Sequence, residues 1–136
     1  MKKYAQFASI ALIVSLFLVS CSTLRSPAGF SSRNWNGGDV AGHTYARFEY
    51  LTGPQEFDVK LDNNQPFNFK YAFDLSNGSI NFTLKSDSRT LLTQSFSGKA
   101  SDSISITPAA NEKFKMILKA TDAKGSFDLS YAPKAN

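Results

Sequence analysis

The chain has 136 residues, with 15 lysines and arginines against 11 aspartates and glutamates, and a formal net charge of +4. This length suits one domain with a sizeable core and is too short for two. Without residues 1–20, which hold two of the lysines, 13 basic against 11 acidic residues remain, and a net charge of +2 is not that of a nucleic-acid-binding surface. Twelve phenylalanines stand against one tryptophan, one histidine and one cysteine, so the sequence is rich in core material and poor in catalytic residue types.

The first 20 residues have the pattern of a secretory signal peptide. Lys2 and Lys3 form a basic start, and an apolar run from Ile10 to Val19 follows, with only Ser15 interrupting it. The run is too short for a membrane-spanning helix, which needs about 20 residues. The sequence therefore predicts a leader over residues 1–20 that the mature protein lacks.

The leader ends in Leu18-Val19-Ser20-Cys21, which resembles the lipobox of bacterial lipoproteins. The resemblance implies cleavage between Ser20 and Cys21 and a diacylglycerol on the Cys21 sulfur, with an N-acyl chain such as palmitate as a further addition and no other cofactor. The alternative is an ordinary signal peptide with a chance cysteine. Because Cys21 is the only cysteine, a disulfide within the chain is excluded, and lipidation accounts for a lone cysteine in an exported protein.

A lipidated Cys21 places the mature protein at the bacterial cell envelope. Two or three acyl chains hold a protein on a bilayer far more firmly than one, so we expect it to be anchored to the membrane and not to span it. Ser22 follows the cysteine, whereas an aspartate there often retains such proteins in the inner membrane. The outer membrane is therefore favoured if the cell has two membranes.

Composition divides the rest of the chain into a tether and a domain. We expect residues 21–38 to hold the lipidated cysteine and a flexible tether, and residues 39–136 to form one β-sandwich domain. Small, polar and basic side chains dominate from Ser22 to about Arg33, which is typical of a linker. The turn-rich patch from Asn34 to Asp39 marks the start of the domain.

Eight short runs that alternate apolar and polar residues follow this patch, separated by turn signals. Such alternation predicts antiparallel strands with one solvated face, and no convincing helix is present. The predicted strands lie near Thr44–Leu51, Glu56–Leu61, Pro66–Leu75, Ser79–Lys85, Leu91–Ser97, Ser103–Thr107, Lys113–Ala120 and Ser126–Tyr131.

Two of the connections are predicted to be hairpins. Asn77-Gly78 suits the positive φ angles of a two-residue type I′ turn, and Asp122–Gly125 suits a four-residue loop. The first hairpin pairs Ser76 with Ser79, and it thereby places Leu75 opposite Ile80, Phe73 opposite Phe82, and Tyr71 opposite Leu84. The second places Ala120 opposite Phe127, Leu118 opposite Leu129, and Met116 opposite Tyr131.

Large aromatic side chains on one strand face indicate a second layer. Phe67, Phe69, Tyr71 and Phe73 share a face, and each buries about 150–250 Å², so a second sheet must cover them. The predicted fold class is therefore all-β: an antiparallel, jelly-roll-like β-sandwich of about eight strands.

Several segments resemble small bacterial β-sandwich modules of the prepeptidase C-terminal type, and envelope lipoproteins that end in a Gly-Ser-Phe-Asp strand. They are Phe67–Leu84, Leu91-Leu92, Phe114–Ala120 and Ala123–Tyr131. The resemblance implies a jelly-roll-like and mostly non-catalytic module. Those modules usually open the penultimate strand with Gly-x-Tyr, whereas this chain has Asn111–Phe114, and no functional residue is carried over.

No metal site is predicted. His43 stands alone and Cys21 is used by lipid, so the clustered ligands that a transition metal needs are missing. Calcium would accept the oxygens of Asp62-Asn63-Asn64, or of Asp39 with Asp102. The alternative, that these residues only shape turns, is favoured.

We do not expect an enzyme. A Ser-His-Asp triad built on His43 would lack a nucleophile motif around any serine, and a solvated histidine is the favoured interpretation. Nothing in the sequence brings together the pair of carboxylates that glycoside hydrolysis requires.

Binding through a sheet face is the remaining chemistry. Alternate residues of the predicted strand at 113–120 point to its outer face, and they include Lys113, Lys115 and Lys119. The predicted hairpin would also place Lys70 opposite Lys85. Such a face attracts anionic headgroups or cell-wall polymers. The alternative is that the lysines keep a solvated face soluble and discourage edge pairing.

Two aromatic residues complete the candidates for ligand binding. Trp35 and Tyr45 suit a platform for sugars or protein partners. A plug that closes the open end of the sandwich is the favoured interpretation of Trp35, because Gly37-Gly38 lets the chain turn sharply around it.

The sequence thus predicts a lipid-anchored, non-catalytic cell-envelope lipoprotein that acts as an interaction or accessory module. The alternative is a binding module for carbohydrate or an anionic cell-envelope polymer. The expected partners are the membrane, through the anchor, and an envelope protein or polysaccharide, with no nucleic acid.

Overall fold

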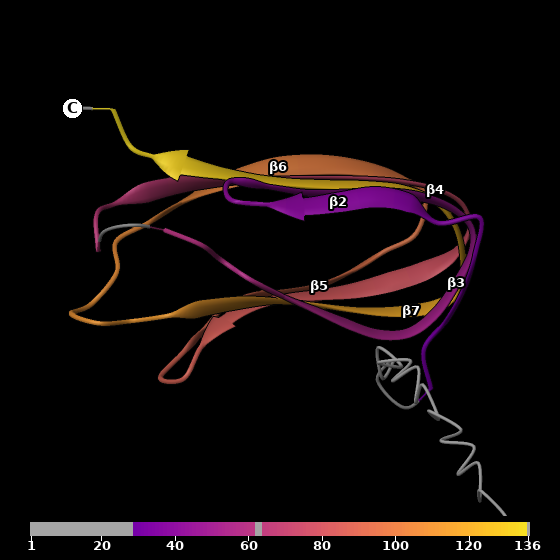
Figure 1. Cartoon of the computed structure of the whole chain (residues 1–136), viewed down its shortest axis with the longest axis horizontal. Coiled ribbons are helices and arrows are strands. Elements are labelled where there is room, and N and C mark those ends of the chain that lie inside the picture. The colour runs from indigo at the N-terminus through magenta and orange to yellow at the C-terminus, as the bar shows by residue number, and fades with distance from the viewer. Residues whose placement is uncertain (1–28, 62–63, 136) are drawn as a thin grey trace, which may run out of the picture.

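A computed structural model describes residues 29–61 and 64–135 as seven antiparallel β-strands (Figure 1). The predicted all-β antiparallel sandwich is confirmed. The predicted signal peptide with Ser20 and Cys21, the tether up to residue 28, and Asp62 and Asn63 lie outside the described residues. Over the described ranges, no helix is long and apolar enough to cross a bilayer. The strands are β1 (Ser31–Arg33), β2 (Asn36–Val40), β3 (His43–Asp58), β4 (Phe67–Ser86), β5 (Thr90–Phe96), β6 (Lys99–Ile106) and β7 (Phe114–Pro133).

Three long strands, β3, β4 and β7, bend in the middle and contribute to both layers of the sandwich (Figure 1). Their pairing continues through the bend, with register shifts at 48–53 in β3 and at 75–79 in β4. One half of each strand joins β2 and β6 in the upper layer, in the order β2-β3-β7-β4-β6. The other half joins β5 in the lower layer, in the order β3-β7-β4-β5, and β1 pairs with β3 at the bend. The domain is therefore one sheet folded back on itself.

Both predicted hairpins are wrong, because each lies within one continuous strand. Leu75 pairs with Gly125 of β7 instead of with Ile80, and Ala120 pairs with Ile80 instead of with Phe127. The positive φ angles that suggested turns occur at bulges, where β4 and β7 bend together: Gly78 has φ +70° and Gly125 has φ +143°. A β-bulge and a tight turn can both require a residue with a positive φ angle, which glycine adopts without strain.

The strand count differs from the prediction for the same reason. The predicted strands at 44–51 and 56–61 are the two halves of β3, and β4 and β7 likewise each contain two predicted strands. β1 and β2 are additional, and they lie in the stretch predicted to be tether and turns. The folded domain thus begins before residue 39, because β2 pairs with the first residues of β3.

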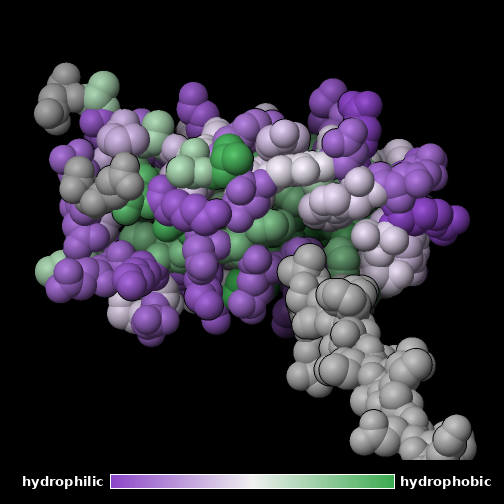
Figure 2. Space-filling view, viewed as in Figure 1, coloured by the Kyte–Doolittle hydropathy of each residue, from purple (hydrophilic) through white to green (hydrophobic). Residues whose placement is uncertain are grey.

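The core lies between the layers, as the alternation of apolar residues predicted. The residues expected to point inward are buried, and phenylalanines from the two layers meet face to face. Phe69 stacks on Phe82 at 5.9 Å between ring centroids, and Phe73 stacks on Phe96 at 4.4 Å. Figure 2 shows hydrophobic side chains as a band between the two hydrophilic outer surfaces.

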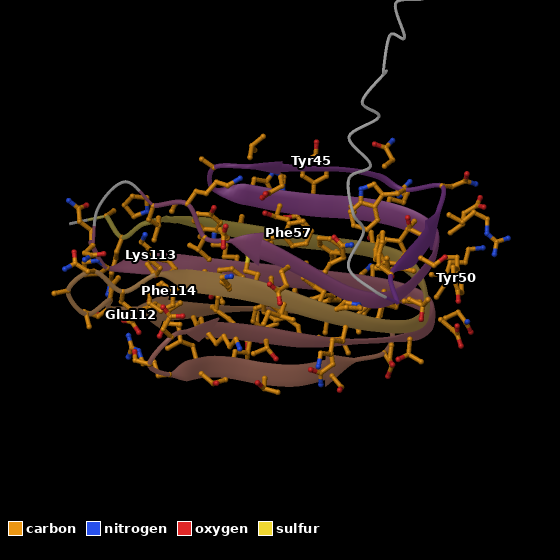
Figure 3. All side chains as sticks on the ribbon, turned by 60° about the horizontal axis from the view of Figure 1, so that its bottom comes forward. Tyr45, Tyr50, Phe57, Glu112, Lys113 and Phe114 are labelled. Atoms are coloured by element: carbon orange, nitrogen blue, oxygen red, sulfur yellow. The ribbon has the colours of Figure 1, made fainter. Side chains whose placement is uncertain are left out.

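Glu112 connects two loops through hydrogen bonds at the end of the sandwich opposite the bend, where Figure 3 labels it. Its carboxylate accepts hydrogen bonds from Arg89 Nε (2.9 Å), Arg89 Nη2 (3.0 Å), Ser86 Oγ (2.6 Å) and the Ala109 backbone N–H (2.8 Å). The Glu112 side chain is only 5% exposed. Arg89 first, then Ser86 and Ala109, lower the pKa of Glu112 from 4.5 to about 2.

Glu112 is therefore expected to stabilise the fold in a pH-dependent way. Because folding lowers the pKa of Glu112, its contribution is complete above its ordinary pKa of 4.5 and is lost as the pH falls toward 2. Denaturant unfolding measured from pH 7 to pH 2.5 should show that the loss of stability with acid is smaller in Glu112→Gln than in the wild type. Glu56→Gln, at an exposed carboxylate on β3, is the matched control and should keep the wild-type dependence.

Candidate binding faces

Trp35 lies between β1 and β2, where it closes the open side of the sandwich. Its indole stacks on Phe48 at 6.0 Å, contacts Phe127 at 5.9 Å, and meets Phe30 edge-on at 6.4 Å. It is partly buried against the core. This is the packing expected of a plug, and it leaves Tyr45 as the more exposed of the two aromatic candidates.

Asp39 and Asp102, one of the two sets of oxygens considered for calcium, do not come together in the structure. Asp39 is on β2 and Asp102 is on β6, at opposite edges of the upper layer. Asp39 instead accepts hydrogen bonds from Thr44 Oγ1 at 2.7 Å and from Lys60 Nζ at 3.0 Å. Among the described residues, no group of three or more histidine, cysteine, aspartate or glutamate side chains could hold a metal ion.

His43 pairs with Asp128 on the surface. Its Nε2 atom is joined to Asp128 Oδ2 by a hydrogen bond of 3.0 Å, and the two side chains are 42% and 56% exposed. Ser130 is the residue opposite His43 on β7, yet no hydrogen bond between His43 and a serine occurs in the described part of the chain. The pair is thus a solvated histidine–carboxylate contact that sits on an open sheet face.

The outer face of the upper layer, here called the aromatic face, carries this pair together with Tyr45. The His43 and Tyr45 rings stack at 4.6 Å with 27° between their planes. The Tyr45 ring also lies across Gly38, the residue opposite it on β2, where a β-carbon would sit 3.2 Å from the tyrosine hydroxyl. Gly38 therefore gives the ring room, while His43 and Asp128 support it from the other side. Figure 3 shows Tyr45 standing at the edge formed by β2 and β3.

Polar side chains extend from this stack across β7, β4 and β6 in rows that the strand register fixes. One row contains His43, Ser130, Lys70 and Ser103, the next contains Tyr45, Asp128, Ala72 and Ser101, and a third contains Arg47, Ser126, Asp74 and Lys99. Small residues in the middle of these rows leave two shallow depressions of about 430 and 460 Å³. Both are lined by Ala72, Ser101 and Asp128, so they form one elongated hollow next to Tyr45.

The hollow presents hydroxyl groups and an uncompensated cation. Asp74 is paired with Lys99 at 3.7 Å, whereas Lys70 forms no ion pair within the described residues. Tyr71 contributes to the lining of the hollow, but its ring points into the core, where it packs on Phe82 and Phe96, and burial, followed by the nearby Asp102 carboxylate, raises the pKa of its hydroxyl. The hollow can thus both donate and accept hydrogen bonds.

The outer face of the lower layer, here called the lysine face, carries the lysines singled out in the sequence. Lys113, Lys115 and Lys119 are exposed, as their parity predicted. The predicted contact between Lys70 and Lys85 is wrong, because Lys70 lies opposite Ser130 and Ser103 in the upper layer. Lys85 lies opposite Lys115, so a like-charge pair exists with a different partner.

Comparisons with known proteins give a distant likeness in fold. No family model and no curated protein matches the chain, so the expected resemblance to prepeptidase C-terminal modules is supported only as far as the β-sandwich fold. A CBM4 structure is similar with a TM-score of 0.41 and 10% identity, over 76% of this chain and 81% of that chain. The structure of CBM35 from Paenibacillus barcinonensis is similar with a TM-score of 0.36 and 9% identity, over 78% and 83%. Both are carbohydrate-binding modules, and at these values the likeness says nothing about a ligand of this chain.

Proposed function

We propose that this protein is a lipid-anchored, non-catalytic carbohydrate-binding module of the bacterial cell envelope, and that its aromatic face binds the sugar. The observation that carries the proposal is the exposed Tyr45–His43 stack beside a hollow lined with hydroxyl and charged side chains. The hollow lies within the volume range of about 300–1,000 Å³ that is usual for small-ligand sites.

The chemistry of a sugar ring matches this arrangement. A pyranose ring has an apolar face of C–H groups, which packs on an aromatic ring, and a rim of hydroxyls, which needs donors and acceptors. Tyr45 and His43 supply the aromatic surface. Asp128 accepts hydrogen bonds and Lys70 donates them, and charged partners make such bonds stronger than neutral ones.

The anchor in this proposal rests on the sequence from Leu18 to Cys21. A diacylglycerol on Cys21 would hold the domain at a membrane, where envelope polysaccharide is within reach. Ser22 at the position after the cysteine supports outer-membrane placement if the cell has two membranes.

Binding of a partner protein is the second candidate function, and one observation favours it. Val40 and Tyr45 are the exposed large hydrophobic side chains of the described residues, at 58% and 42%, and both lie at the β2 edge of the upper layer. Exposed apolar side chains next to an open strand edge suit a protein surface. Recovery of one stoichiometric protein from envelope extracts, without retention on polysaccharide, would favour this function over sugar binding.

Tyr45→Ala is expected to lower affinity for the bound glycan about tenfold, which corresponds to ~1.4 kcal/mol. The physical reason is the loss of the stacking surface, since aromatic contacts contribute roughly 0.5–1.5 kcal/mol beyond the area they bury. Affinity electrophoresis in gels that contain β-glucan, xylan or dextran, together with sedimentation on purified peptidoglycan, would identify the glycan and measure the change.

Two control variants make this test specific. Tyr45→Phe keeps the ring and should retain affinity within about twofold, since only a hydroxyl is lost. Tyr50→Ala removes a tyrosine at the bent end of the sandwich, away from Tyr45 (Figure 3) and outside the lining of the hollow, and should leave binding unchanged. Failure of the wild type to bind any of these glycans, or equal binding by Tyr45→Ala, would overturn the proposal.

A further inference from the structure

The lysine face carries more positive charge than its neighbours neutralise. Lys85, Lys113, Lys115 and Lys119 are exposed, and none of the four forms an ion pair with a carboxylate in the part of the chain that the structure describes. Two acidic residues of β3, Glu56 and Asp58, lie opposite Ile117 and Lys115 at the edge of the face. The four lysines and these two acids leave a net excess of two positive charges, and Asp87, in the turn that follows β4, adds one exposed carboxylate near Lys85.

The strand register concentrates this charge near the loop end of the face. Lys85 and Lys115 are directly opposite each other on β4 and β7, and Lys113, labelled in Figure 3, immediately precedes the start of β7. Like charges in this position destabilise a sheet. An external anion that lies over both ammonium groups would offset that cost.

The described chain begins beside the lysine face. Gly29 and Phe30 pack directly against Gly53, where a β-carbon on Gly53 would collide with them. The next residue of β3, Pro54, lies opposite Lys119. In Figure 1 the indigo start of the described chain lies at the lower right, below the bend.

We infer that the lysine face lies against the anionic phospholipid headgroups of the membrane that holds Cys21, and that the aromatic face is thereby directed away from the bilayer. This inference rests on the lipid anchor of the proposed function. An anionic surface attracts lysines that lie close to it, and the attraction fades within a Debye length, so the short path from the anchor to this face matters.

The length of the chain before Gly29 supports this orientation. Cys21 precedes Gly29 by eight positions, which span at most about 27 Å when fully extended. With so short a connection, the side of the domain where the chain emerges stays near the bilayer.

The test uses the full-length protein, processed in cells and reconstituted into vesicles. Intact mass spectrometry first establishes whether Cys21 carries acyl chains. Acetylation of lysines is then followed residue by residue on vesicles of phosphatidylcholine alone and on vesicles that also contain phosphatidylglycerol. On the anionic vesicles we expect Lys85, Lys115 and Lys119 to react several-fold more slowly than on the neutral ones, and high salt should remove the difference. Lys70, on the aromatic face, is the internal control and should react equally on both.

A double variant tests whether the lysines themselves keep the lysine face against the anionic membrane. In Lys85→Ala/Lys115→Ala protein, the ratio of docked to undocked orientation should fall roughly fivefold per lysine, so that Lys119 reacts almost as fast as on neutral vesicles. Lys70→Ala/Lys99→Ala, which removes the same charge from the upper layer, should leave the protection of Lys119 intact.

The possible outcomes distinguish a failure of this inference from a failure of the proposed function. An unmodified Cys21 would remove the anchor and with it this inference and the membrane placement, whereas glycan binding by the aromatic face would still be tested separately. Equal reactivity of Lys115 on anionic and neutral vesicles, in protein that is acylated and still binds glycan, would overturn the inference alone. Protection of Lys115 by a soluble anionic polysaccharide in the absence of vesicles would also overturn it, because the face would then be a polymer site.

Discussion

Phe73→Ala is expected to lower the free energy of unfolding by about 3–5 kcal/mol. The Phe73 side chain is 1% exposed, and its ring stacks on Phe96 at 4.4 Å and lies 5.7 Å from Phe82. It thus connects the upper half of β4 with two strands of the lower layer. Because small domains are stable by only about 5–15 kcal/mol, the loss would be a large part of the total.

Guanidinium unfolding followed by circular dichroism measures this change from the shift of the midpoint at constant slope. Gln94→Ala is the control, since Gln94 is an exposed residue of the same strand as Phe96, and it should change stability by less than about 0.5 kcal/mol. A loss below about 1 kcal/mol for Phe73→Ala would show that this ring does not join the two layers.

The inward faces of the strands could be predicted because side-chain parity needs no knowledge of strand partners. Residues two apart on a strand point to the same side wherever that strand pairs. Phe73 and Phe82 were therefore correctly assigned to the core although their predicted pairing is wrong, and they still meet across the layers at 5.7 Å. The outward position of Lys115 was predictable in the same way.

Strand partners could not be predicted, because a hairpin and a bent long strand share one sequence pattern. In both, two alternating runs flank residues with positive φ, as around Asn77 and Gly78. The choice between them is made by β7, which has a matching length and its own bulge at Asp122 and Gly125. That match is a long-range property of the chain, and no local segment contains it.

The aromatic face was only partly predictable for the same reason. Tyr45 could be recognised as an exposed aromatic residue from its place in the sequence. Asp128 and Ser101, however, reach the site from β7 and β6, and only the strand order of the upper layer brings them beside Tyr45. The alternating serines of β6 carried a signal of a hydroxyl-lined face, which could be interpreted only once its neighbours were known.

Gly78→Ala is expected to cost about 3 kcal/mol or more, because two effects combine at this bulge. Gly78 has φ +70°, and a left-handed backbone costs a residue with a β-carbon roughly 1–2 kcal/mol. A β-carbon would also collide with the backbone carbonyl oxygens of Asp122 and Thr121 on the paired strand. Relieving that collision requires a shift of β7 at the bend, and overpacking of this kind typically costs about 1–3 kcal/mol.

Gly98→Ala separates the two effects. Gly98 has φ +95°, and a β-carbon there would meet nothing within 4 Å, so this variant should lose only the roughly 1–2 kcal/mol that the left-handed backbone costs. Denaturant unfolding of the two variants side by side measures the difference, which is the cost of separating β4 from β7 at the bend. If the two variants were equally stable, Gly78 would have open space around it, as in an exposed hairpin turn, and β4 and β7 would not run through the bend as paired strands.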